Sequence, residues 1–163
     1  MFKIKLLILL LINLIISSCA NHKLYSQTKY SVGYIGGEYT GFIFKNLLLT
    51  HLVGSDLYNQ NSNYQIKGNV EHASSVYITN IDNTSDRSNI ETYMNIEIYD
   101  QKNECIVYKW NNEVEQFYIY ASNEKFLSNQ TASEKINYDN TEQLVKNFIN
   151  KIYSLDNLKC KNE

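Results

Sequence analysis

Hydrophobic and polar residues alternate near the start of the chain's folded part, between Lys29 and Ile35. This period of two predicts a short strand, whose hydrophobic side is formed by Tyr30, Val32 and Tyr34. Gly36 and Gly37 then end the alternation. From Thr40 to Val53 the period becomes helical, and Gly54 follows as a stop signal. The hydrophobic side of this expected helix is formed by Phe44, Leu47, Leu48, Leu52 and Val53.

Three later stretches return to the period of two, and polar segments separate them. The alternation from Tyr64 to Ile78 is continuous enough to favour one long strand, or a strand with a small irregularity near Ala73. A second strand is expected from Ile90 to Tyr99, after a turn cluster at residues 82–86. A third begins at Cys105, continues to Asn111 and extends over residues 117–120; its hydrophobic side is formed by Ile106, Tyr108 and Trp110. Such strands predict an antiparallel meander with one face on the core and the other in water.

The last hydrophobic pattern is helical and is formed by Leu144, Val145, Phe148, Ile149, Ile152 and Leu155. Two capping boxes compete for the start of this helix, Thr131 with Glu134 and Asp139 with Glu142. We favour the earlier start. The order strand, helix, three strands, helix (β-α-β-β-β-α) predicts an α+β fold in which two helices and one sheet close on each other as two layers.

The first residues show a different pattern, which is typical of an export signal. Lys3 and Lys5 precede an almost unbroken run of Leu and Ile from residue 6 to residue 16, and Ser17, Ser18 and Cys19 follow. The run is short for a membrane-spanning helix, so we favour a signal over an anchoring helix. Residues 16–19 resemble the bacterial lipobox, which implies that residues 1–18 are a signal peptide and that Cys19 carries diacylglycerol and an N-acyl lipid.

We therefore expect a lipidated tether at residues 19–28, a single domain at residues 29–158 and a C-terminal tail at residues 159–163. Several acyl chains on one residue make a firm membrane anchor. In such lipoproteins Asp after the lipidated Cys favours the inner membrane, and Ala20 therefore favours the outer membrane. The oxidising periplasm would allow Cys105 and Cys160 to form a disulfide. The sequence leaves open whether they are bonded or free.

Composition excludes several classes of function. The formal net charge is −2, and scattered lysines without a basic patch argue against a nucleic-acid-binding protein. The three histidines have no metal-ligand spacing, and neither a nucleophile elbow nor a phosphate-binding loop is present. We therefore expect no enzyme, no metal and no cofactor other than the covalent lipid on Cys19.

Arg87 is the single arginine of the chain, and it follows the turn before the second strand of the meander. A guanidinium can bind a phosphate with two parallel hydrogen bonds. The residue alone does not establish such a role, because exposed arginines are common on hairpins and usually bind nothing specific.

Several short motifs occur in the order that is known from one family. They are Cys19 with Leu24-Tyr25, Gly41 to Leu52, Asp86-Arg87 with the strand after it, Tyr120 to Ser122, Ala132 to Lys135, Gln143-Leu144, and Ile149 to Leu155. Together they cover most of the mature chain and resemble LptE, the small outer-membrane lipoprotein of lipopolysaccharide assembly, in its alphaproteobacterial form. The chain departs from that pattern by extra residues between Ser122 and Ala132 and by Asn and Asp at the alanine-rich helix start.

The resemblance implies two helices packed on one face of a four-stranded, largely antiparallel mixed sheet, in a two-layer sandwich. It also implies a non-catalytic protein of the outer membrane, on its periplasmic side or inside a barrel lumen. Such a protein plugs and helps to assemble the LptD-type translocon β-barrel and assists delivery of lipopolysaccharide to the cell surface. Arg87 matches the family's arginine at the start of the middle strand, and Lys109 on the next strand would add a second charge for lipid A phosphate if the register brings it near, which the sequence does not fix. The competing class is a surface-exposed lipoprotein of adhesin or antigen type without a barrel partner.

Overall fold

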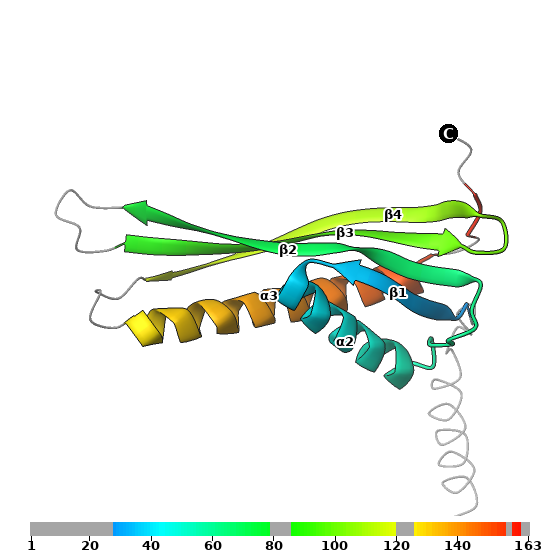
Figure 1. The fold of residues 1–163 in the computed structure, drawn as a ribbon, viewed down its shortest axis with the longest axis horizontal. Helices are drawn as coiled ribbons and strands as arrows, with labels where there is room; N and C mark the ends of the chain where they lie inside the picture. The colour runs from blue at the N-terminus through cyan, green and yellow to red at the C-terminus, as the bar shows by residue number, and fades with distance from the viewer. Residues whose placement is uncertain (1–27, 79–85, 120–125, 156–157, 161–163) are drawn as a thin grey trace, which may run out of the picture.

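The computed structural model describes residues 28–78, 86–119, 126–155 and 158–160. Within these ranges the elements are, in chain order, β1 (Tyr30–Gly36), α2 (Glu38–Gly54), β2 (Tyr64–Ile78), β3 (Asp86–Asp100), β4 (Cys105–Ile119) and α3 (Phe126–Tyr153). The strands form one sheet in the order β1-β2-β3-β4, and both helices lie on the same face of it (Figure 1). The predicted α+β two-layer fold is confirmed.

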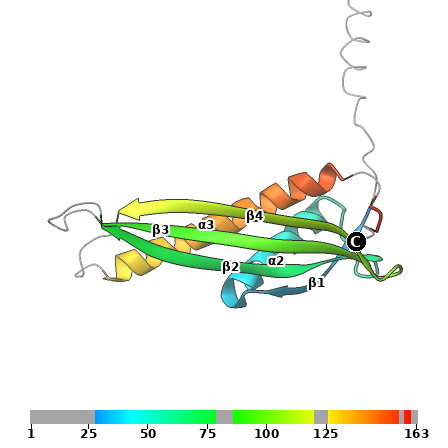
Figure 2. The same ribbon diagram turned by 90° about the horizontal axis from the view of Figure 1, so that it is seen from above.

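The sheet is mixed because β1 and β2 run parallel and are connected through α2, whereas β2, β3 and β4 form an antiparallel meander. β2 is one continuous strand, without the irregularity near Ala73 that the sequence left open, and pairs with β3 from Tyr64 opposite Asp100 to Ile78 opposite Asp86. β1 pairs with β2 only as far as Asn69. As a result β2 continues along the edge of the sheet beyond the end of β1 (Figure 2).

A change of register in β1 overturns one of the predicted core positions. Val32 lies opposite Ile66, but Ile35 lies opposite Gly68, so the alternation shifts between Val32 and Ile35. Ile35 is consequently buried, and Tyr34, expected on the hydrophobic side, is 80% exposed. An irregularity of this kind turns the residues after it to the other face of the sheet, and a regular period of two cannot predict it.

A second irregularity has the same effect in β4. Tyr108 lies opposite Ile98 whereas Ile106 lies opposite Tyr99, which leaves Val107 as an extra residue between the two pairs. Val107 belongs to the hydrophobic core and is 5% exposed. Ile106 shares a side of the sheet with Tyr99, because directly opposed residues of antiparallel strands point the same way. The prediction that Ile106, Tyr108 and Trp110 share one side was therefore wrong for Ile106.

The core lies between the helices and the covered face of the sheet. Its fully buried side chains include Phe44, Leu48, Ile66, Ile96 and Phe148, and the Trp110 ring stacks on Phe148 with the ring centroids 5.6 Å apart. Val53 was predicted on the buried side of α2 but is 61% exposed. At about 100° per residue, nine residues place Val53 half a turn of the helix away from Phe44.

The helix α3 begins at Phe126, before both capping boxes considered from the sequence. Glu134 accepts a hydrogen bond from the side chain of Gln130, and Asp139 pairs with Lys135 at 2.9 Å, so these acidic residues make contacts within the helix. A capping box is a local motif whose residues form ordinary i, i+4 pairs when the helix starts earlier. The favoured start at Thr131 was therefore wrong.

A disulfide joins Cys105, at the start of β4, to Cys160, after the end of α3, with their Cα atoms 5.7 Å apart. It fixes the segment that follows α3 to the beginning of β4. None of the helices in the described ranges is long and apolar enough to cross a membrane.

Candidate functional site

Of the residues expected to carry function, Arg87 and Lys109 lie in two separate parts of the sheet. Cys19 is outside the described residues. Arg87 is the second residue of β3, where its side chain is exposed and its Cα lies opposite Ile119 of β4. Lys109 lies opposite Glu97, and its Nζ atom is 3.2 Å from the Glu97 carboxylate.

The register separates Arg87 from Lys109. Lys109 is ten residues away from Ile119 along β4, which is about 33 Å at roughly 3.3 Å per residue. One lipid phosphate cannot contact both side chains over that distance. The expectation that Lys109 adds a second charge beside Arg87 is therefore corrected: strand pairing, which the sequence did not specify, places the two residues at opposite ends of the sheet.

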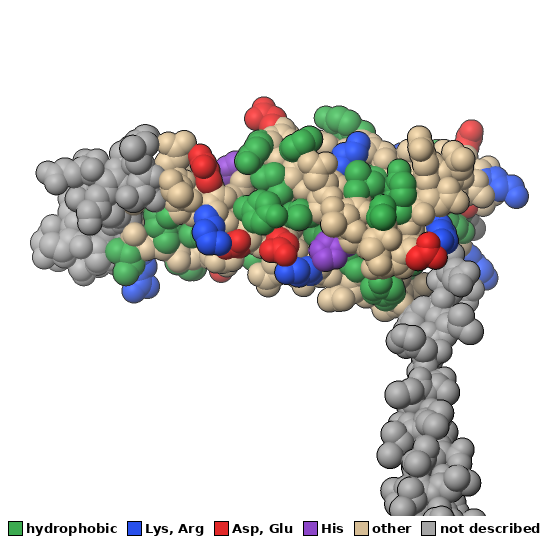
Figure 3. All heavy atoms as spheres, turned by 90° about the horizontal axis from the view of Figure 1, so that it is seen from below, with side chains coloured by type: hydrophobic (Ala, Val, Ile, Leu, Met, Phe, Trp, Pro, Cys, Tyr) green, Lys and Arg blue, Asp and Glu red, His purple; other side chains and the backbone are tan. Residues whose placement is uncertain are grey.

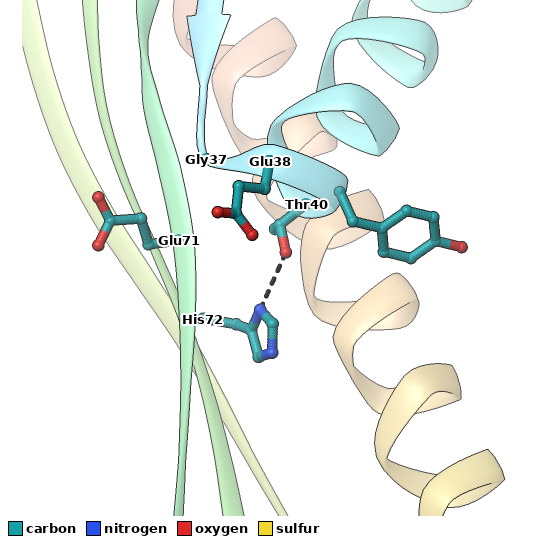
Figure 4. A pocket seen from close by; sticks show the side chains of 6 residues that line it. Gly37, Glu38, Thr40, Glu71 and His72 are labelled. Carbon is teal, nitrogen blue, oxygen red and sulfur yellow. Dashed lines mark hydrogen bonds between the residues drawn. The ribbon is translucent and has the colours of Figure 1, made fainter.

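The structure brings other polar residues together where α2 begins. Gly37 has a φ of 105°, and a Cβ atom there would lie 1.6 Å from the main-chain oxygen of Val70. Only glycine fits this turn, because it tolerates a positive φ and has no side chain to collide with β2. The turn places the first residues of α2 directly beside β2, with Thr40 next to His72 (Figure 4).

A chain of hydrogen bonds runs inward from His72. The Thr40 hydroxyl lies 3.0 Å from His72 Nδ1, and the Asn137 side-chain amide donates to Thr40 Oγ1 at 3.2 Å. The Thr92 hydroxyl in turn donates to Asn137 Oδ1 at 3.2 Å. Thr40, Thr92 and Asn137 are buried, whereas His72 is exposed. The chain thus connects α2, β2, β3 and α3 and ends at the surface in an imidazole.

Asn140 continues this polar layer one turn further along α3. Its amide nitrogen donates to the main-chain oxygens of Ile90 at 3.0 Å and Val114 at 3.2 Å. Its Oδ1 atom is buried and has no hydrogen-bond partner among the described residues. A buried amide oxygen without a partner costs about 1–3 kcal/mol.

Two cavities open where the polar chain reaches the surface. One of about 420 Å³ lies between the start of α2 and β2, and one of about 240 Å³ lies between the start of α2 and α3. Tyr39 and His72 line both, so the two form one groove. The groove offers an aromatic ring, hydroxyl and amide groups and an imidazole. The described residues contain no cluster of ligands suited to a metal ion.

The opposite, open face of the sheet carries mainly charged and aromatic side chains. Lys67 and Lys109 flank Glu97 across three strands, and the Lys67 Nζ atom lies 3.6 Å from the centre of the Tyr99 ring. Further along, the Tyr93 hydroxyl donates to Glu71 at 2.5 Å. This bond, together with one from Asn69, holds the pKa of Glu71 below its usual value.

Asp100 is 5% exposed and organises the β3–β4 hairpin. Its carboxylate accepts hydrogen bonds from the main-chain N–H groups of Lys102 at 2.9 Å and Asn103 at 3.1 Å, and from the Asn103 side chain at 2.8 Å. Burial opposes ionisation, but these hydrogen bonds outweigh it and lower the pKa of Asp100. The turn thus folds back over the Asp100 side chain.

Sequence reasoning also missed the polar layer around Thr40 and Asn137. A signal was present in the spacing, since Asn137, Asn140 and Thr141 continue the buried side of α3 that Leu144 and Phe148 define. Polar residues on the hydrophobic side of a helix are rarely left unpaired. This spacing alone indicates a buried hydrogen-bond network, although it does not identify the partners.

No family model and no curated protein matches the chain. Solved structures do share its fold. Rare lipoprotein B from Shewanella oneidensis has a TM-score of 0.64 and 11% identity over 78% of this chain and 95% of its own. A minor lipoprotein from Acinetobacter baumannii has a TM-score of 0.61 and 14% identity, over 79% and 92%.

A further structure, described as a putative lipoprotein from Caulobacter crescentus, has a TM-score of 0.55 and 15% identity over 77% of this chain and 88% of its own. At such identities the likeness shows the fold alone. The chain therefore has the fold of these bacterial lipoproteins.

Proposed function

We propose that this protein is an outer-membrane lipoprotein that plugs and helps to assemble an LptD-type translocon barrel and assists delivery of lipopolysaccharide to the cell surface. The observation that carries the proposal is that two independent similarities, one of sequence motifs and one of fold, agree. The order of motifs resembles LptE, and the chain folds into a sandwich that three bacterial lipoproteins share. The proposed role is to bind and position a partner and a lipid, without catalysis.

The shape of the domain suits a plug. The longest strands have 15 residues, about 50 Å at roughly 3.3 Å per residue, and α3 has 28 residues, about 42 Å at 1.5 Å per residue. A narrow body of this length can be enclosed by a barrel wall along its sides. Aromatic residues are exposed on both layers: Tyr39 and Phe42 on α2, and Tyr93 and Phe117 on the sheet.

The helical layer offers a surface for such contact. Figure 3 looks onto this layer and shows hydrophobic side chains gathered near its middle, with charged residues scattered around them. Exposed aromatic rings combine a large apolar area with a polar edge and are frequent at protein interfaces. Arg87, at the far end of the sheet from the disulfide, is the proposed contact for a lipid A phosphate, with its guanidinium donating two hydrogen bonds.

The proposal is tested by affinity purification of the tagged full-length protein from outer membranes in several mild detergents. We expect a one-to-one complex with one barrel protein of much larger mass. The control is the Cys19→Ala variant, which should lose incorporation of labelled palmitate and membrane retention. Recovery of the wild-type protein without a barrel in every detergent would contradict the proposal and would favour a surface lipoprotein of adhesin or antigen type.

A further inference from the structure

The edge of the sheet formed by the second half of β2 is open. β1 accompanies β2 as far as Asn69 and then leaves the sheet, because Gly37 turns the chain beneath it into α2. From Val70 to Ile78 no strand of the described part of the chain lies on this side of β2 (Figure 2). A strand edge of this kind presents main-chain N–H and C=O groups that another strand can pair with.

The contact with Gly37 shows which residues direct these groups outward. The nitrogen, carbon and oxygen of the Val70 main chain all face the position where a Gly37 Cβ would stand. Successive residues of a strand direct their main-chain groups to alternate sides. His72, Ser74 and Val76 therefore direct their N–H and C=O groups to the open side, and all three residues are exposed.

The other edge of the sheet is protected in the ways that natural proteins use. β4 carries an irregularity at Val107, a disulfide at Cys105, and the charged residues Lys109, Glu113 and Glu115. Irregularities and charges on an edge strand prevent pairing with another chain. The open half of β2 carries the charged Glu71 at its start but has Ala73, Ser74 and Ser75 at its centre and no lysine. Because the second half of β2 lacks an irregularity or a lysine, this edge of the sheet is available for pairing with another strand.

The surroundings of the edge define the kind of strand that would fit. On the helical side Val76 is 57% exposed and Tyr39, beside the groove, is 67% exposed, so this side offers apolar contact. On the open side Glu71 lies on β2 and Glu91 lies on β3 opposite Ala73, whereas Arg87 lies opposite Tyr77 near the end of the strand. A strand with apolar residues on one side and basic residues on the other would match both.

We propose that β2 binds an extended segment of the partner barrel by β-strand addition between His72 and Ile78, and that this segment alternates apolar and basic residues. The inference rests on the proposed function, which supplies the partner. Charge favours a partner over a second copy of this chain, because residues 70–78 contain Glu71 and His72 but no lysine or arginine. A paired second copy would add negative charge to an edge that is already acidic.

The test measures binding of the co-purified barrel by edge variants of the full-length lipidated protein. Ser74→Pro removes one outward N–H and places a ring in the path of the incoming strand, which an edge strand tolerates. We expect about tenfold weaker binding of the barrel. Ser74→Ala keeps the N–H group and should bind as wild type. Val76→Lys puts a charge on the apolar side, leaves the backbone unchanged and should also weaken binding. It tests the proposal even if Ser74→Pro fails to fold.

A photo-crosslinker at position 76 gives a second measurement on the same complex. Crosslinks to one extended segment of the barrel, absent when the crosslinker stands at Asn111 on β4, would support the proposal. If the wild type binds the barrel and both Ser74→Pro and Val76→Lys bind equally well, this inference is wrong and the proposed function stands. Recovery of no barrel by the wild type overturns the proposed function and this inference with it. A crosslinked pair of copies of this chain would overturn strand addition by the barrel.

Discussion

At the scale of single residues, the two basic side chains considered for lipid binding have different surroundings. Arg87 is exposed at the end of the sheet near the β2–β3 connection, whereas Lys109 is paired with Glu97 near the other end. A third polar residue, Asp100, is buried beneath the β3–β4 hairpin and stabilises it by accepting hydrogen bonds from the turn. These settings lead to separate predictions for function and for stability.

Arg87→Ala should weaken binding of lipopolysaccharide by about tenfold or more, because each charged hydrogen bond contributes about 1.5–3 kcal/mol. The free energy of unfolding should change by less than about 0.5 kcal/mol, as is usual for exposed positions. The matched control is Lys109→Ala, which breaks an exposed ion pair and should leave lipopolysaccharide binding unchanged. Binding titrations and thermal melts of both variants check this prediction. Equal binding by Arg87→Ala and wild type would exclude a role for Arg87.

Asp100→Asn should destabilise the domain at neutral pH by about 1–3 kcal/mol, because the ionised carboxylate accepts three hydrogen bonds. The pKa of Asp100 in the folded state lies below that in the unfolded chain. Its contribution is therefore present above the unfolded pKa and is lost as the pH falls through the folded pKa. Urea unfolding from pH 7 to pH 2 should show the curves of wild type and variant converging at acid pH. A constant difference over this range would contradict the assignment.

At the scale of elements, the position of α2 depends on how β1 ends. Gly37 is the only described glycine with a positive φ, and its contact with Val70 fixes the distance between the start of α2 and β2. That distance allows Thr40 to contact His72 and forms the groove. The same turn ends the pairing of β1 with β2 and leaves the second half of β2 open.

Gly37→Ala should destabilise the domain by about 2–4 kcal/mol, because the added Cβ would overlap the Val70 oxygen and the backbone strain alone costs about 1–3 kcal/mol. Gly54→Ala is the matched control. A Cβ at Gly54 meets nothing within 4 Å, so this helical position should be unchanged or more stable by up to about 1 kcal/mol. Chemical denaturation of both variants compares them. Similar stability of the two would show that the turn adjusts without cost.

At the scale of the whole molecule, the disulfide connects the end of the chain to the sheet. The bond closes a loop of 55 residues that contains most of β4 and all of α3. Closing such a loop restricts the unfolded chain and stabilises the folded one. It also holds the segment after α3 in place beside the β3–β4 hairpin.

Cys160→Ser should lower the free energy of unfolding by about 2–4 kcal/mol. Cys105→Ser should have the same effect, and the double variant should lose no more than either single variant, because all three remove one bond. Thermal melts with and without a reducing agent check this, since reduction should lower the melting temperature of the wild type only. Additive losses in the double variant would show that the two sulfur atoms contribute separately.

The sequence by itself determined the type and order of the elements, the covered face of the long strands and most of the hydrophobic core. These features follow from the period of hydrophobic residues, which is a local property of the chain. The tertiary structure alone decided the irregularities at Val32 and Val107 and the early start of α3. It also decided the hydrogen-bond chain from His72 to Thr92 and the separation of Arg87 from Lys109. Each of these depends on register or on contacts between distant segments, which a local period does not contain.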